Sequence, residues 1–145
     1  MNEFEIVSVN ISEDKGTVKT PVEEITLKPD HGIENDAHAG PWHRQVSLLA
    51  FESIEKLHEQ GFDIQPGDCA ENITTKGVVL YELPVGTKLY IDECELEVTQ
   101  IGKKCHTACE VFKNVGVCIM PREGIFAKVI TGGTANAQSS CHYSI

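Results

Sequence analysis

Residues 87–100 read TKLYIDECELEVTQ and hold two short apolar runs on either side of an acidic turn. Thr87–Ile91 and Glu95–Gln100 each have the length of a β-strand, and Asp92-Glu93 joins them. In the second run apolar residues alternate with glutamates, which is typical of a strand with one buried and one solvated face. This stretch therefore predicts two successive strands of a sheet that is half exposed to solvent.

The rest of the chain continues this pattern, because short apolar runs are separated by turns that contain glycine or proline. A single helix is expected at Glu52–Gln60, since its apolar residues have helical spacing and Gly61 can cap it. Further strands are expected at Phe4–Ile11, within Val18–Leu27, and at Gln45–Ala50, Ile73–Leu80 and Gly124–Ile130. One helix among about seven short strands predicts a mainly β fold, an antiparallel β-barrel-like domain with a few short helices.

The length and charge of the chain limit the classes of protein to which it can belong. Its 145 residues suit a single domain that spans 1–145. A net charge of −10 argues against nucleic-acid and anionic-membrane partners, which need a basic surface. No apolar run approaches the ~20 residues of a membrane span, and the acidic N-terminus does not resemble a signal peptide. We therefore expect a cytoplasmic protein whose six cysteines are reduced thiols.

Three polar clusters interrupt the β pattern. The first lies largely in Pro29–His43, a long segment without helical or strand periodicity, and such loops are usually functional. In the second, Glu71-Asn72 follows Gly67-Asp68, and spacing alone favours a turn with side-chain capping over catalysis. The clusters comprise His31, Asp36, His38, His43 and Arg44; then 67–72 (GDCAEN); and then 103–109 (KKCHTAC) with 118–124 (CIMPREG).

Cys105 is the candidate nucleophile or metal ligand of the third cluster. Lys103, Lys104 and His106 surround it in the sequence, and positive charge favours the reactive thiolate over the thiol. Cys109 follows four residues later, so the two cysteines would share one face of a helical turn. That spacing suits a metal pair or a thiol with a resolving partner, and it equally suits two buried loop thiols.

Arg44 is the second residue that its chemistry singles out. It is one of only two arginines, and a guanidinium can fork onto a phosphate or carboxylate where a lysine cannot. An ordinary surface or salt-bridge arginine is the alternative. In so acidic a chain an anionic ligand needs a local basic pocket, for which the candidates are Lys28, Arg44, Lys103, Lys104 and Arg122.

Together these residues resemble the MOSC domain family, named for the C-terminal part of molybdenum-cofactor sulfurase. The resemblance rests on three segments in the expected order, which cover most of residues 32–133. They are GIENDAHAGPWHRQVSLLAFESIEKL (32–57), GDCAENITTKGVVLYELPVGTKLYI (67–91) and LEVTQIGKKCHTACEVFKNVGVCIMPREGIFAKVITGG (96–133). Single elements such as the Gly-Asp and Pro-Val-Gly turns are weak signals, whereas their ordered combination is specific.

The resemblance implies a barrel-like β domain associated with the molybdenum cofactor, a pterin that binds molybdenum through a dithiolene and carries a phosphate. Cys105 best matches the cysteine that ligates molybdenum in some members; other members are proposed to pass sulfur as a cysteine persulfide. Arg44 would hold the anionic end of the cofactor, and Lys104 would be a further cofactor-binding residue. The remaining motif positions would line the pocket: Asp36, His38, Glu71 and Asn72.

Three functions are compatible with these observations. The first is a module that binds the molybdenum cofactor or carries sulfur for it through Cys105, with cofactor-biosynthesis proteins, a sulfur donor or a molybdoenzyme as partners. The second is a molybdoenzyme that reduces N-hydroxylated compounds with electrons from an external donor. The third is a zinc-stabilised, non-catalytic binding domain, with Cys105, Cys109 and the nearby His38 and His43 as metal ligands.

Two departures from the family pattern matter. Members often continue past the Gly-Gly pair with a Gly-Asp turn and a final strand, whereas residues 134–145 here read TANAQSSCHYSI. Either the barrel closes differently, or this tail is loose. The chain also lacks the N-terminal β-barrel and electron-transfer domains of larger MOSC reductases. It lacks a pyridoxal-phosphate desulfurase domain as well, so no pyridoxal phosphate is expected here.

Overall fold

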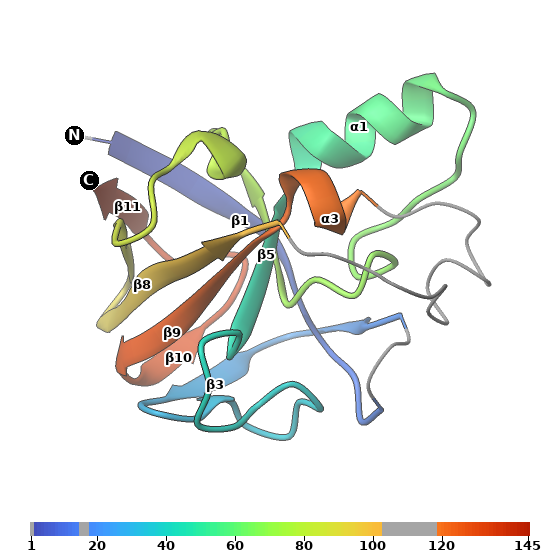
Figure 1. The fold of residues 1–145 in the computed structure, drawn as a ribbon. Coiled ribbons are helices and arrows are strands. Elements are labelled where there is room, and N and C mark those ends of the chain that lie inside the picture. The colour runs from blue at the N-terminus through green and yellow to red at the C-terminus, as the bar shows by residue number, and fades with distance from the viewer. Residues whose placement is uncertain (1, 15–17, 103–118) are drawn as a thin grey trace.

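The computed structural model describes residues 2–14, 18–102 and 119–145 (Figure 1). Each strand expected from the sequence is present, although the one expected at Ile73–Leu80 ends at Lys76, where Gly77 turns the chain with a φ of 92°. The elements are β1 (Asn2–Ile11), β2 (Thr20–Val22), β3 (Ile25–Lys28), β4 (Gly32–Ile33), β5 (Val46–Ala50), α1 (Phe51–Glu59), β6 (Ile73–Lys76), η1 (Leu80–Glu82), β7 (Lys88–Ile91), β8 (Cys94–Ile101), α3 (Met120–Glu123), β9 (Ile125–Thr131), β10 (Gly133–Ala135) and β11 (Cys141–Ser144).

Seven of these strands close into a barrel, in the order β11-β7-β8-β9-β5-β6-β1, with β1 pairing back onto β11. The two strands expected within 87–100 form a hairpin, in which Ile91 lies opposite Cys94. Neighbouring barrel strands are antiparallel except β5 and β6, which run parallel because the crossover through α1 connects them. The mainly β, barrel-like fold that the sequence predicts is confirmed.

The C-terminal segment closes this barrel. Phe4 lies opposite Cys141 across the β1–β11 pair, and Cys141 lies opposite Ile91 across the β11–β7 pair. The two ends of the chain consequently lie side by side (Figure 1). Of the two alternatives for residues 134–145, closure is what the structure shows, and the tail is not loose. A four-residue strand such as CHYS carries too little periodicity to be recognised before its partners are known.

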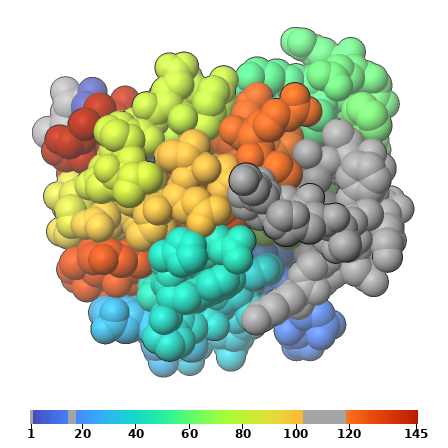
Figure 2. Space-filling view, viewed as in Figure 1, coloured from blue at the N-terminus to red at the C-terminus, as the bar shows by residue number. Residues whose placement is uncertain are grey.

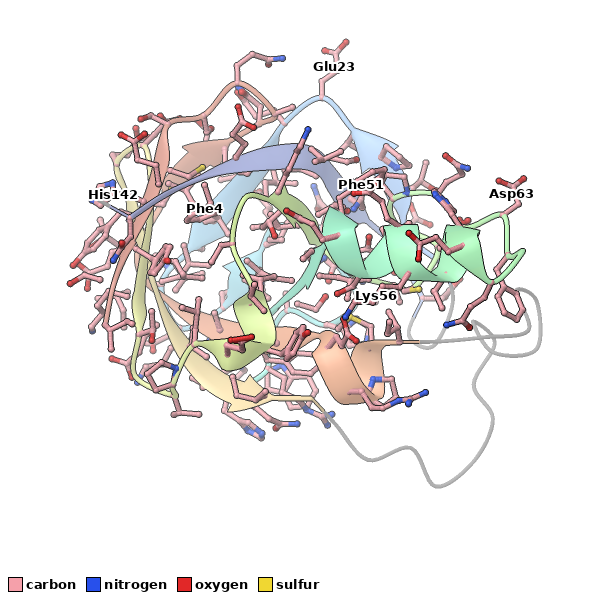
Figure 3. The ribbon with its side chains drawn as sticks, turned by 90° about the horizontal axis from the view of Figure 1, so that it is seen from above. Phe4, Glu23, Phe51, Lys56, Asp63 and His142 are labelled. Atoms are coloured by element: carbon pink, nitrogen blue, oxygen red, sulfur yellow. The ribbon has the colours of Figure 1, made fainter. Side chains whose placement is uncertain are left out.

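Two apolar clusters hold the fold together. The larger fills the barrel and includes Phe4, which Figure 3 shows inside the barrel, while His142 lies on its outer side. The smaller lies beneath α1, where the buried Ile54 and Leu57 belong to one cluster with Phe126 of β9. Helices α1 and α3 therefore cover one side of the barrel (Figure 1).

A small second sheet, in the order β10-β3-β4, positions the long loop that the sequence marks as functional. After β4 the chain turns through residues 34–45 and then enters β5. Gly32 has a φ of 113°, and a Cβ at this position would lie 2.8 Å from the Gln45 carbonyl oxygen. Only glycine combines this backbone conformation with such a close approach, so Gly32 allows the loop to return beside its own beginning.

Removal of residues 141–145 would leave β1 and β7 without a partner at the barrel seam. We expect the free energy of unfolding to fall by about 3 kcal/mol or more, because the buried Cys141 and several inter-strand hydrogen bonds are lost. Removal of Ile145 alone, which is 78% exposed, is the matched control and should cost less than ~0.5 kcal/mol. Urea denaturation measures all three proteins, and equal stabilities would contradict this role of β11.

Candidate functional site

Five of the residues expected at the site lie in the described part of the chain: Asp36, His38, Arg44, Glu71 and Asn72. Lys104, Cys105 and Cys109 lie outside the described residues, as does the rest of segment 103–118. The five form two clusters, one in the loop before β5 and one between β1, β5 and β6.

Asp36 forms a fully buried ion pair with Lys19. Lys19 Nζ lies 2.8 Å from Asp36 Oδ1, and neither side chain is exposed to solvent. Burial alone would raise the pKa of Asp36, but the hydrogen bond and charge of Lys19, with the Ser12 and His38 amides, hold this pKa below its ordinary value. Asp36 is therefore a carboxylate at neutral pH, and its ion pair joins the loop to the end of β1 and the start of β2.

His38 shares the ammonium group of this ion pair. Its Nδ1 lies 3.1 Å from Lys19 Nζ, which also donates a hydrogen bond to Ser12 Oγ at 3.1 Å. The side chain of His38 is 25% exposed. The imidazole ring therefore reaches from the buried ion pair towards the surface.

Trp42, the only tryptophan of the sequence, connects His38 to Arg44. Its Nε1 donates a hydrogen bond to the His38 carbonyl oxygen at 2.7 Å, and the Arg44 guanidinium carbon lies over its ring, 4.7 Å from the centroid. The same carbon lies 5.7 Å from the ring centroid of Phe126 on β9. These cation–π contacts orient the flat guanidinium group. Among the described residues, Arg44 Nε is buried without a hydrogen-bond partner.

Hydrogen bonds hold this loop against the end of β8. His43 Nε2 lies 2.8 Å from Gln100 Oε1, and Gln100 Nε2 donates to the Gly102 carbonyl oxygen at 2.7 Å. The Gly102 amide in turn donates to the Gly124 carbonyl oxygen at 2.7 Å. Figure 2 shows the loop (turquoise) packed against the strand end (amber). Arg44 thus comes directly after His43, which is hydrogen-bonded to Gln100 near the end of β8 at the rim of the barrel.

Glu71 lies in the second cluster and is fully buried. Its Oε2 accepts hydrogen bonds from Gly67 N at 3.0 Å and from Thr74 Oγ1 at 2.7 Å, whereas its Oε1 has no partner among the described residues. Burial raises the pKa of Glu71, and its hydrogen bonds offset this effect only in part. The shift favours the uncharged carboxyl group, the form that is easier to bury.

Asn72 ties the strands around Glu71 together. Its Oδ1 accepts hydrogen bonds from Ser47 N at 3.0 Å and Ser47 Oγ at 3.1 Å, while its Nδ2 donates to the Asn10 carbonyl oxygen at 3.1 Å. Both ends of the amide are therefore used to join β1 to β5.

The two clusters meet at the backbone of Gly67. Lys19 N donates to the Gly67 carbonyl oxygen at 2.8 Å, and the Gly67 amide donates to Glu71. The structure thus connects Asp36 to His38 directly, and His38 to Arg44 through Trp42. It places Glu71 and Asn72 in a neighbouring buried network, separate from this group.

Three further residues build the site although they were not expected from the sequence: Lys19, Trp42 and Gln100. Lys19 precedes a strand of three residues, and nothing local shows that its partner Asp36 lies 17 positions away. For Trp42 a signal existed, because a lone tryptophan inside a histidine-rich loop is an aromatic surface next to polar groups.

The cysteines of the described residues are all buried: Cys69, Cys94 and Cys141. Burial, with nearby acidic groups, raises the pKa of Cys94 to about 11 and that of Cys141 to about 12, so neither is a thiolate at neutral pH. Across residues 2–14, 18–102 and 119–145, no three His, Cys, Asp or Glu side chains gather as metal ligands. The zinc set considered above includes Cys105 and Cys109, which lie outside these ranges.

The barrel agrees with the fold expected of a MOSC domain. The MOSC domain model matches residues 35–139, and the chain belongs to this family. The family is linked in general to binding of the molybdenum cofactor.

Several solved structures share the fold. The YuaD protein from Bacillus subtilis is similar with a TM-score of 0.81 at 17% identity, covering 99% of this chain and 96% of that one. YiiM from Geobacillus stearothermophilus gives 0.75 at 16% identity, with 98% and 75% covered, and YiiM from Escherichia coli gives 0.68 at 16%, with 99% and 70% covered. No curated protein matches the chain. No helix in the described residues has the length and apolar character needed to cross a bilayer.

The raised pKa of Glu71 makes the free energy of unfolding depend on pH, and replacing Glu71 with glutamine should remove this dependence. The folded protein holds this proton more tightly than the unfolded chain, so the contribution is fully present below the ordinary pKa of 4.5 and is lost as pH rises through the folded pKa. We expect Glu71→Gln, which stays uncharged, to be more stable than the wild type at pH 8, with the difference shrinking towards pH 4.

Thermal and urea denaturation at the two pH values measure this difference. Glu55→Gln, on the exposed face of α1, is the control and should show no such pH dependence. A Glu71→Gln protein that is less stable than the wild type at pH 8 would show that the carboxyl group is held ionised.

Proposed function

We propose that this MOSC domain binds the molybdenum cofactor, or carries sulfur for it, through Cys105, with Arg44 holding the anionic end of the cofactor. Cofactor-biosynthesis proteins, a sulfur donor or a molybdoenzyme would be its partners, in the cytoplasm. The family membership supports the link to the cofactor. The residue roles are argued from the chemistry of the site.

The main support for the proposal comes from the surroundings of the Arg44 guanidinium. Its guanidinium lies over Trp42, and its Nε is buried without a hydrogen-bond partner among the described residues. No ion pair within those residues involves Arg44. A buried hydrogen-bond donor without a partner destabilises the fold unless a ligand accepts its hydrogen bond. A guanidinium can bind two oxygens of a phosphate at once. The residues present therefore fit an anionic group at this place.

The position of Arg44 at the rim also supports a role for Cys105. Gln100 links the Arg44 loop to Gly102, and Cys105 follows three residues later in the sequence. Three residues of chain span at most about 11 Å. This tether is short enough to allow a Cys105 thiol to reach a ligand that the Arg44 loop would hold.

In this proposal the residues of the chain bind and orient the cofactor, and the bound cofactor would supply the chemistry of its molybdenum and dithiolene. Cys105 offers a thiolate, a soft donor suited to a thiophilic centre or to a persulfide. Lys104 adds positive charge next to this thiol. Asp36 and His38 would border the pocket through the Lys19 and Trp42 contacts, and the remaining motif residues, Glu71 and Asn72, would support it from the neighbouring buried network.

Replacement of Arg44 tests the anion-binding role directly. We expect Arg44→Lys, made in a host that produces the cofactor, to retain at least tenfold less molybdenum and pterin, because lysine cannot bind a phosphate in a bidentate manner. Lys76→Arg, at an exposed lysine of β6 outside the site, is the control and should retain the wild-type amount. Metal analysis and pterin fluorescence give the occupancies, and equal retention by both variants would remove Arg44 from the site.

Replacement of Cys105 tests the ligand or sulfur-carrier role. We expect the wild type to carry molybdenum with pterin, or a persulfide on the peptide that contains Cys105, and Cys105→Ala to carry neither. Cys94→Ala removes a buried thiol of raised pKa and should leave both signals unchanged. Mass spectrometry and metal analysis measure the outcome. A wild-type protein without molybdenum, pterin or persulfide at full cofactor supply would refute the proposed function.

A further inference from the structure

We propose that the edge of β1 between its partners β11 and β2 binds an extended protein segment that carries basic side chains. The segment would add a short strand to this edge and place a lysine or arginine beside Glu23 and Glu24. The residues that form this surface are separate from those of the proposed cofactor site. The inference therefore goes beyond the proposed function and does not depend on it.

The first observation is a break in the pairing of β1. Strand β6 pairs with one edge of β1, whereas β11 pairs with residues 2–4 and β2 with residues 9–11. The barrel order places β6 and β11 on either side of β1, and Val9 pairs with both β6 and β2. Strands β11 and β2 therefore share the second edge. Across the described residues, no strand pairs with residues 5–8 on that edge, which we call the open edge of β1.

A cleft of about 600 Å³ lies at this open edge. Val7, Val9 and Val22 supply the apolar part of its lining. The register shift between Ile6 and Ser8 inserts Val7 as an extra residue of β1, and such a bulge turns a side chain out of the regular alternation. Four residues of strand span about 13 Å, which is room for about four residues of an added strand. A strand edge without a partner is a template for pairing with another chain.

Hydrogen bonds fix two sides of the cleft. In the turn before β11, Asn136 Oδ1 accepts a hydrogen bond from the Gln138 amide at 2.8 Å, and the Asn136 carbonyl oxygen accepts from the Ser139 amide at 3.1 Å. On β1, Ser8 Oγ donates to Asn10 Oδ1 at 2.6 Å. A cleft that is already formed lowers the entropic cost of binding.

The charge of the cleft selects a basic partner. Glu23 and Glu24 connect β2 to β3, line the cleft and are exposed, and Figure 3 shows Glu23 pointing outward. Neither side chain forms an ion pair within the described residues. The other residues that line the cleft are uncharged. A lysine or arginine of the added strand would therefore meet two carboxylates and no positive group of the lining.

The test uses the full chain labelled with 15N and two hexapeptides with blocked ends. One peptide alternates lysine with valine and the other alternates glutamate with valine, so they differ only in the charged side chain. We expect the lysine peptide to shift the amide signals of Val7, Ser8 and Val22 in proton–nitrogen correlation spectra. It should also slow amide hydrogen exchange within residues 5–8, because strand addition protects backbone N–H groups. The glutamate peptide should bind roughly tenfold more weakly.

Variants test the selection by charge. The double variant Glu23→Gln/Glu24→Gln should bind the lysine peptide about fivefold more weakly, because two exposed charge contacts are lost. The double variant Glu55→Gln/Glu59→Gln removes the same charge from exposed positions of α1 and is the matched control, with unchanged affinity. Gln138→Lys adds a positive charge to the lining and should also weaken binding. Equal affinities of the two double variants would overturn the selection by charge.

Other occupants of the cleft give different results. Spermidine carries positive charges without a peptide backbone, and if it slowed exchange within residues 5–8 as the lysine peptide does, strand addition would be wrong. A dimer in sedimentation velocity that the lysine peptide dissociates would assign the open edge to a second copy of the chain. A lysine peptide that shifts no signal of the cleft at millimolar concentration would overturn the proposal. All these measurements use protein without cofactor, so they are decided separately from the Arg44 and Cys105 experiments.

Discussion

Lys19 and Asp36 meet inside the protein with their charged atoms 2.8 Å apart and no exposed surface on either side chain. Removing one partner of such a buried pair leaves an uncompensated charge, which costs about 3–5 kcal/mol. The pair joins the segment before β2 to the loop 34–45, and this loop carries both His38 and Arg44. The geometry of the rim therefore depends on a contact whose loss would destabilise the protein as a whole.

The same pair helps explain how a chain of charge −10 can offer a site to an anion. Asp36, the carboxylate nearest to His38, is neutralised by Lys19. Glu71, in the neighbouring network, has a raised pKa that favours its uncharged form. The two acids among the expected site residues thus add little negative charge. Local electrostatics at the rim can therefore oppose the sign of the whole molecule.

Sequence reasoning succeeded where the signal is local and failed where it is a pairing at a distance. The two strands within 87–100 can be recognised from the alternation of apolar and polar residues and from the acidic turn between them. The structure pairs them as a hairpin across this turn. Strand β11 has only four residues, and it can be recognised as a strand only from its pairing with Phe4 of β1 and Ile91 of β7. Lys19 likewise has no motif of its own, because its role exists only once the fold brings Asp36 to it. Arg44 stands out in the sequence because the chemistry of a guanidinium is specific even without a known partner, and its role in the site stays a prediction.

The described thiols show which surroundings suppress a thiolate in this protein. Inside the barrel, Cys94 and Cys141 meet apolar neighbours and the acidic Asp92, and their pKa values rise to about 11 and about 12. Burial is the main cause of both shifts, and nearby carboxylates add to it. A thiolate at neutral pH needs the opposite surroundings, and the lysines that precede Cys105 in the sequence are groups of that kind. Under the proposed function, Cys105 would thus be the reactive thiol, in contrast to the inert thiols Cys94 and Cys141.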